Sequence, residues 1–254
     1  MRGNIRAIGE ICMELLYPRK CIFCGRVITM KSYRGIIREK SYDFLCKDCK
    51  EDIKKAYIEE PYCLKCGKQL DNMTQEYCVD CRRLNHIYDR GLSVFKYHDR
   101  IKESVYRFKY KDCKCYGEFY GEQMAEKYKE IIKKWQPNAI IPVPIHKARM
   151  RKRGYNQAEL IGRALAKKIN IPLDVNVLFR DKKTEPQKKL SKEIRIKNLE
   201  NAFKVSTNVV RYNKIILVDD IYTTGATINA CARVLKQAGV QEVYFISICI
   251  GEGI

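Results

Sequence analysis

The sequence lacks any long apolar run. None of its stretches approaches the about 18 consecutive apolar residues that a helix needs to cross a bilayer. The N-terminal segment, residues 1–20, carries charges at Arg6, Glu10 and Glu14 within its apolar pattern, which is not the pattern of a signal peptide. We therefore expect a cytoplasmic protein with no membrane span and no export signal.

Two common nucleotide-binding motifs are also missing. Neither the phosphate-loop pattern G-x-x-x-x-G-K nor the dinucleotide pattern G-x-G-x-x-G occurs, which disfavours nucleoside triphosphatases and dehydrogenases. Histidine is scarce, and the three present, His86, His98 and His146, have no metal-ligand spacing. We assign none of them a role.

Acidic residues are too few to balance the basic ones. The 254 residues include 50 Lys and Arg against 30 Asp and Glu, a formal net charge of +20. Such a charge favours anionic partners, namely nucleic acid, phosphate-rich ligands or acidic proteins, although a solvated basic surface is the simpler alternative. With 46% hydrophobic residues, the chain has enough apolar material for one large domain or two smaller ones.

Cysteine, in contrast, is abundant, with 13 residues, of which eight form four C-x-x-C pairs. Two thiolates at this spacing can bind one tetrahedral metal ion, and two such pairs complete a four-sulfur site. The pattern predicts two structural zinc ions rather than a redox dithiol. Sequential pairing is the simplest arrangement, and a crossed pairing stays open. The expected ligands are Cys21, Cys24, Cys46, Cys49, Cys63, Cys66, Cys78 and Cys81.

Strands and helices alternate from Leu92 onward. Apolar patterns predict strands over 92–97, 138–145, 172–180, 214–220 and 243–250, and helices over 99–111, 118–135, 154–169 and 227–238. This alternation predicts an α/β fold with a mainly parallel sheet and helices on both faces.

The most apolar predicted strand, 214–220, ends in two acidic residues that are followed by a threonine- and glycine-rich turn. Asp219 and Asp220 close it, and a turn of Thr223, Thr224, Gly225, Ala226 and Thr227 leads into the next helix. Backbone amides, hydroxyls and the positive end of the helix dipole at such a turn suit a phosphate, and paired carboxylates suit ribose hydroxyls or hydrated Mg²⁺. The simpler alternative is a strand-to-helix turn capped by threonine.

These residues carry a resemblance. The segment 218–227 resembles the phosphoribosyl-pyrophosphate (PRPP) motif of type I phosphoribosyltransferases. The chain also resembles the ComF family, bacterial competence proteins associated with DNA uptake in natural transformation. This resemblance covers residues 10–250 and lies in the order of the cysteine pairs, the segment 140–161, the segment 184–198 and this motif. The resemblance implies an N-terminal helix and double zinc ribbon over residues 1–90, followed by a phosphoribosyltransferase-like domain over residues 91–254.

Site roles follow from the resemblance. It implies that Asp219 and Asp220 are the catalytic pair that contacts the ribose and organises Mg²⁺, and that residues 223–227 hold the 5′-phosphate. It places Val143 and Pro144 in the pyrophosphate loop and residues 180–197 in a mobile, basic loop that closes over PRPP. In such enzymes a separate hood region recognises the acceptor base, and no hood is evident here unless the zinc domain serves as one.

Two functions therefore stay open. One is a Mg²⁺-dependent phosphoribosyltransferase with an unidentified acceptor. The other is a non-catalytic module of a competence complex that binds single-stranded DNA, together with other competence proteins such as a DNA-uptake helicase. The basic segments 147–153 and 180–197 suit a phosphate backbone, and Tyr155, which follows the first of them, suits base stacking.

Overall fold

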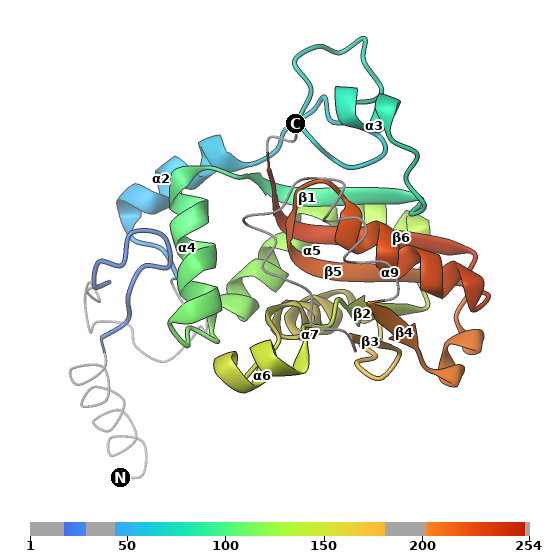
Figure 1. Ribbon diagram of the computed structural model, residues 1–254. Helices are drawn as coiled ribbons and strands as arrows, with labels where there is room; N and C mark the ends of the chain where they lie inside the picture. Colours follow the sequence, from blue (N-terminus) through green and yellow to red (C-terminus); the bar gives the residue numbers. More distant parts are fainter. Residues whose placement is uncertain (1–17, 29–43, 181–201, 252–254) are drawn as a thin grey trace. The chain divides into compact units, whose positions relative to one another are not determined.

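The computed structural model describes residues 18–28, 44–180 and 202–251, which fall into two compact units, Met1–Ala56 and Tyr57–Ile254 (Figure 1). In the first unit, the Cys21 carbonyl accepts a hydrogen bond from the Gly25 N–H at 2.8 Å, which closes the first cysteine turn. Helix α2 (Lys47–Ala56) begins directly after Cys46 and buries Cys49 and Ile53. The first two cysteine pairs thus lie in one small unit.

The second unit is built on a four-stranded parallel sheet. Its order is β1 (Arg90–Lys96), β6 (Glu242–Ile250), β5 (Lys214–Tyr222) and β2 (Ala139–Pro142). Most residues of these strands are buried, as expected of a parallel sheet that is covered on both faces. The prediction of a mainly parallel sheet is confirmed.

Helices cover both faces of this sheet. Tyr244 of β6 stacks on Trp135 of α5 (Tyr116–Trp135), with ring centroids 4.4 Å apart. The next residue, Phe245, belongs instead to the buried cluster that contains Ile228 and Leu235 of α9 (Ala226–Gln237). Since successive residues of a strand point to opposite faces, α5 and α9 lie on opposite sides.

The remaining helices lie around this core. Helix α7 (Gln157–Ile169) packs against α5, β2 and β5. Helix α4 (Asp99–Tyr110) follows β1, and the short basic helix α6 (Lys147–Arg153) follows β2. A 3-10 helix, η2 (Thr207–Arg211), precedes β5. Among the described helices, none combines the length and apolar character needed to cross a membrane.

The strand predicted over 172–180 is wrong in its first half. Only β3 (Leu178–Arg180) is a strand, and it pairs antiparallel with β4 (Phe203–Val205), which the sequence pattern did not indicate. The Asp174 carboxylate accepts a hydrogen bond from the Asn176 N–H at 2.9 Å, a local turn that competes with strand pairing. The two strands flank residues 181–201, which lie outside the described residues.

The third and fourth cysteine pairs belong to the second unit. Cys63, Cys66 and Cys78 are buried in the same apolar cluster as Phe245 of β6. The short helix α3 (Val79–Arg83) carries Cys81, and the Lys65 carbonyl accepts a hydrogen bond from the Gly91 N–H at 2.8 Å, just inside β1. The predicted domain boundary at residue 90 stays a prediction, whereas the compact units divide after Ala56.

Candidate functional site

The predicted site residues meet at the carboxyl edge of the sheet. Asp219 and Asp220 lie near the carboxyl end of strand β5, and Gly225 is the N-cap of α9. The Val143 N–H donates a hydrogen bond to the Val218 carbonyl at 2.9 Å, so the loop that follows β2 lies beside the acidic pair. Ligands of open parallel sheets bind at this edge. The structure thus brings the predicted phosphate turn, acidic pair and Val143 loop together.

Both the backbone conformation and the close packing at position 225 require glycine. Its φ of +74° lies in the left-handed region that L side chains rarely adopt. A Cβ at this position would also lie 2.6 Å from the Tyr222 hydroxyl and 3.2 Å from Cε1 of His86. A valine at position 225 would therefore disturb the turn itself before it affected any ligand.

The two carboxylates differ in their partners. One Asp219 oxygen accepts a hydrogen bond from the Asp220 N–H at 2.8 Å. The Asp220 carboxylate lies 2.9 Å from the ammonium group of Lys109, and both side chains are more than four-fifths buried. Burial, together with the charge of Asp220, raises the pKa of Asp219 to about 7. For Lys109, burial acts to lower the pKa, but the pairing with Asp220 outweighs it and the pKa is raised.

Sequence reasoning missed Lys109. It lies in α4, for which the sequence predicts only a helix over 99–111. Ile101 and Val105 are buried at a spacing of four residues, and Lys109 comes four residues later. A lysine that continues a buried stripe is a signal for a buried ionic partner, and here that partner is Asp220.

The region of the third and fourth cysteine pairs borders the phosphate turn. A pocket is lined by Thr223 and Thr224 of the turn and, from the other side, by residues that include Cys66, Lys68, Asp80 and His86. The hydroxyls of Tyr88 and Tyr222 lie 2.7 Å apart and join the same two segments, and Tyr222 also lines the pocket. The region of the third and fourth cysteine pairs thus lies close enough to the turn to contact a ligand that binds there.

His86 is a pocket residue that the sequence did not indicate. The side-chain oxygen of Asn229 accepts a hydrogen bond from the Ile87 N–H at 2.9 Å, which directs the amide nitrogen of Asn229 to Nδ1 of His86, also at 2.9 Å. Nδ1 must then accept, and the ring proton lies on Nε2. Burial and the charge of Lys65 lower the pKa of His86, which keeps the ring neutral.

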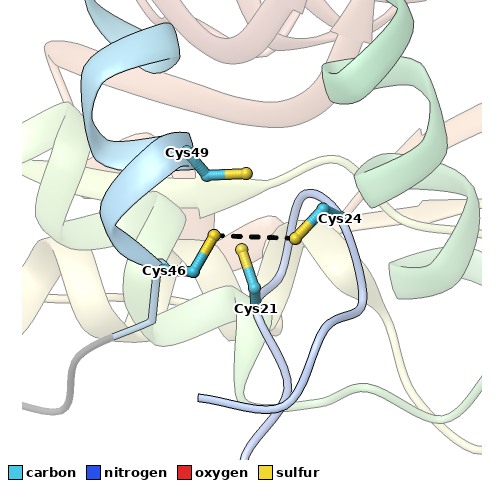
Figure 2. Close-up of side chains that lie close together, drawn as sticks. All are labelled: Cys21, Cys24, Cys46 and Cys49. Atoms are coloured by element: carbon cyan, nitrogen blue, oxygen red, sulfur yellow. Dashed lines mark hydrogen bonds between the residues drawn. The ribbon is translucent and has the colours of Figure 1, made fainter. Parts of the chain in front are cut away.

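The eight paired cysteines form two clusters with sequential pairing. Cys21, Cys24, Cys46 and Cys49 make one cluster, and Cys63, Cys66, Cys78 and Cys81 make the other; within each, the sulfur atoms lie within 4.8 Å of one another. In Figure 2 the four side chains of the first cluster converge on one point. The crossed pairing that the sequence left open is not what the structure shows.

Both clusters fit zinc. The Sγ atoms of Cys24 and Cys46, and likewise those of Cys66 and Cys78, lie 3.7 Å apart. Zn–S bonds of about 2.3 Å in a tetrahedron require a sulfur–sulfur distance of about 3.8 Å, whereas a disulfide requires about 2.05 Å. With four thiolates in each cluster, no ligand position is left for a substrate, so the ions would stabilise the fold.

The basic segment 147–153 forms α6, but its predicted aromatic neighbour is buried. Tyr155 is 6% exposed and donates a hydrogen bond to the Phe108 carbonyl. Asn156 caps α7 by accepting from the Ala158 N–H at 3.2 Å and donates to the Val143 carbonyl at 3.1 Å. The prediction that Tyr155 stacks on bases is therefore wrong. In the segment 180–197, all but Arg180 lie outside the described residues.

Comparisons with known proteins agree with this arrangement. Residues 12–82 match the family model of the double zinc ribbon domain, and residues 156–252 match that of the phosphoribosyl transferase domain. Competence protein F of Haemophilus influenzae is 33% identical over 204 residues, which cover 78% of this chain and 87% of that protein. The chain belongs to the ComF family.

Two further relatives support this assignment. Competence protein ComFC of Bacillus subtilis is 28% identical over 86% of this chain and 89% of its own. DNA utilization protein YhgH of Escherichia coli O157:H7 is 33% identical over 44% of this chain and 49% of its own. The resemblance to the ComF family and the type I phosphoribosyltransferase-like fold with its double zinc ribbon are confirmed.

The two cysteine clusters should differ in what they stabilise. Cys24→Ser and Cys81→Ser each replace a half-buried ligand and should each release about one zinc ion per chain. Cys81→Ser should also lower the melting temperature of the main unfolding transition by roughly 5–10 °C, because its cluster is part of the core of the sheet. Cys24→Ser should leave that transition unchanged. Equal melting shifts, or zinc retained by both variants, would contradict this assignment; elemental analysis and calorimetry measure both.

The buried Lys109–Asp220 pair should matter for stability. Lys109→Met leaves the Asp220 carboxylate without its partner and should lower the free energy of unfolding by about 1–3 kcal/mol. Lys102→Met on the same helix is the matched control, since its partner Asp99 is 85% exposed and its loss should cost less than about 0.5 kcal/mol. Urea unfolding of both variants gives the comparison, and equal losses would show that the pair is not special.

Proposed function

We propose that this protein binds PRPP with Mg²⁺ at the turn between β5 and α9 and transfers its phosphoribosyl group to an acceptor. The proposal is based on one observation: the Asp219–Asp220 pair and the N-terminus of α9 lie together at the carboxyl end of the parallel strand β5. Membership of a family whose model includes a phosphoribosyl transferase domain supports it.

Each part of the turn would have its own role. The free N–H groups of the first turn of α9, with the hydroxyls of Thr223, Thr224 and Thr227, would bind the 5′-phosphate. Asp219 and Asp220 would fix the ribose hydroxyls, which requires Asp220 to exchange Lys109 for the ligand. Val143 and Pro144 would approach the pyrophosphate from β2.

The reaction would be a substitution at the anomeric carbon. The bond from C1 to the pyrophosphate oxygen breaks, the electron pair leaves with pyrophosphate, and an acceptor nucleophile bonds to C1. Bound Mg²⁺ would neutralise part of the charge of the leaving group. The chain's own contribution is to position the ribose and to hold the phosphates in place.

PRPP with Mg²⁺ should raise the melting temperature of the wild-type protein, because a ligand that binds only the folded state stabilises it. Asp220→Asn and Thr224→Val should each lose most of that rise. Asp99→Asn, at an exposed carboxylate of α4, is the control and should keep it. An equal rise in all four proteins would place the phosphate elsewhere in the molecule.

A second activity, single-stranded DNA binding, is favoured by α6. This helix carries five cations, Lys147, Arg149, Arg151, Lys152 and Arg153, and no acid. Within the described part of the chain, none of the five forms an ion pair, so their charge is available to an anionic partner. We expect this activity to operate in the cytoplasm within a competence complex that includes a DNA-uptake helicase.

DNA binding through α6 should depend steeply on salt, at a log–log slope of about −0.7 per neutralised phosphate. Arg151→Glu with Lys152→Glu should weaken binding and flatten the slope by roughly 1.4. Lys133→Glu with Lys134→Glu, at the exposed end of α5, makes the same change in net charge and should alter both values much less. Fluorescence anisotropy over a salt series distinguishes the two, and equal effects would mean that α6 is not the contact.

A further inference from the structure

Two tyrosines of α4 are exposed side by side. Tyr106 is 52% exposed and Tyr110 is 47% exposed, and their ring centroids lie 5.0 Å apart. Two tyrosines of the next helix, Tyr116 and Tyr120 of α5, are in contrast at most 5% exposed. Aromatic faces that lie side by side in solvent are available to contact a ligand or a partner.

The pair is joined to α6 by one arginine. The guanidinium carbon of Arg153 lies over the Tyr110 ring, 5.0 Å from its centroid, and one Arg153 nitrogen lies 3.4 Å from the Tyr110 hydroxyl. A second nitrogen of Arg153 donates to the Gln157 side chain at 2.8 Å, which fixes the guanidinium plane. Arg153 therefore joins the exposed ring pair of α4 to the row of cations on α6.

We propose that Tyr106, Tyr110 and Arg153, the tyrosine platform, stack the bases of single-stranded DNA whose phosphates contact α6. This inference rests on the DNA-binding activity proposed above and names the residues that contact the bases. Exposed aromatic faces beside uncompensated cations are the two features that sequence-independent single-strand sites combine.

The charge of α6 selects this occupant. Five cations of α6 without an acid fit a polyanion. A second copy of this chain, with its formal charge of +20, would instead be repelled. A duplex holds its bases in the stack and offers no free base faces to Tyr106 and Tyr110, whereas a single strand offers them.

The platform differs from the contact that the sequence predicts. Tyr155 follows the cations of α6 in the sequence but lies in the core. Tyr110 precedes them by more than thirty residues and meets the last of them, Arg153, at the C-terminal end of α4. The aromatic side chains available to bases beside α6 are therefore Tyr106 and Tyr110, not Tyr155.

The test separates bases from phosphates. Binding of a labelled oligothymidylate is compared with binding of a strand of the same length and charge whose bases have been removed. Tyr106→Ala with Tyr110→Ala should weaken oligothymidylate binding by roughly five-fold or more for each base that stacks, and should leave the abasic strand and the salt slope unchanged. Tyr106→Phe with Tyr110→Phe keeps the ring faces and should keep the affinity.

A matched control comes from the second cysteine cluster region. Tyr77 is 41% exposed there, and Tyr77→Ala should leave oligothymidylate binding unchanged. If Tyr77→Ala lost oligothymidylate binding while the Tyr106/Tyr110 double variant retained it, the bases would lie on the second cysteine cluster region and the tyrosine platform would be overturned. So would equal weakening of both strands by the double variant. Wild-type protein that binds neither strand would overturn the DNA-binding proposal itself, which is a different failure.

Discussion

The second cysteine cluster and the parallel sheet share one buried core. Phe245 of β6 stacks on Tyr222 with the two rings 4.8 Å apart, and Tyr222 in turn meets Tyr88 of the cysteine region through their hydroxyls. Because Tyr222 directly precedes the phosphate turn, the metal cluster and the turn are held by the same buried contacts. A structural zinc ion here would therefore support the site as well as its own loop.

Helix α4 connects the two proposed activities. Its buried side carries Lys109, which neutralises Asp220 at the phosphate turn, and its exposed side carries Tyr106 and Tyr110. A ligand that takes Asp220 from Lys109 leaves a buried cation to be satisfied, and a phosphorylated ligand at the same edge of the sheet supplies the charge. Under the two proposals, the helix would serve a phosphoribosyl ligand on one side and a DNA strand on the other.

Much of this arrangement could be predicted from the sequence, because the signals are local. Fixed C-x-x-C spacing predicts the eight thiolates, and an apolar strand that ends in two acids and a threonine–glycine turn predicts the β5–α9 site. What escaped prediction depends on contacts between distant segments. Lys109, His86 and the exposure of Tyr110 follow from the packing of one element on another, and β4 follows from pairing with β3 across residues 181–201.

A crystal structure of the protein with PRPP and Mg²⁺ is the sharpest test of the proposal that the β5–α9 turn holds a phosphoribosyl group. We expect the 5′-phosphate to lie against the backbone N–H groups of residues 223–227, with the ribose hydroxyls on Asp219 and Asp220 and the Lys109 ammonium displaced from Asp220. PRPP found on α6, or a turn that stays empty with the Lys109–Asp220 pair intact at saturating PRPP, would contradict it.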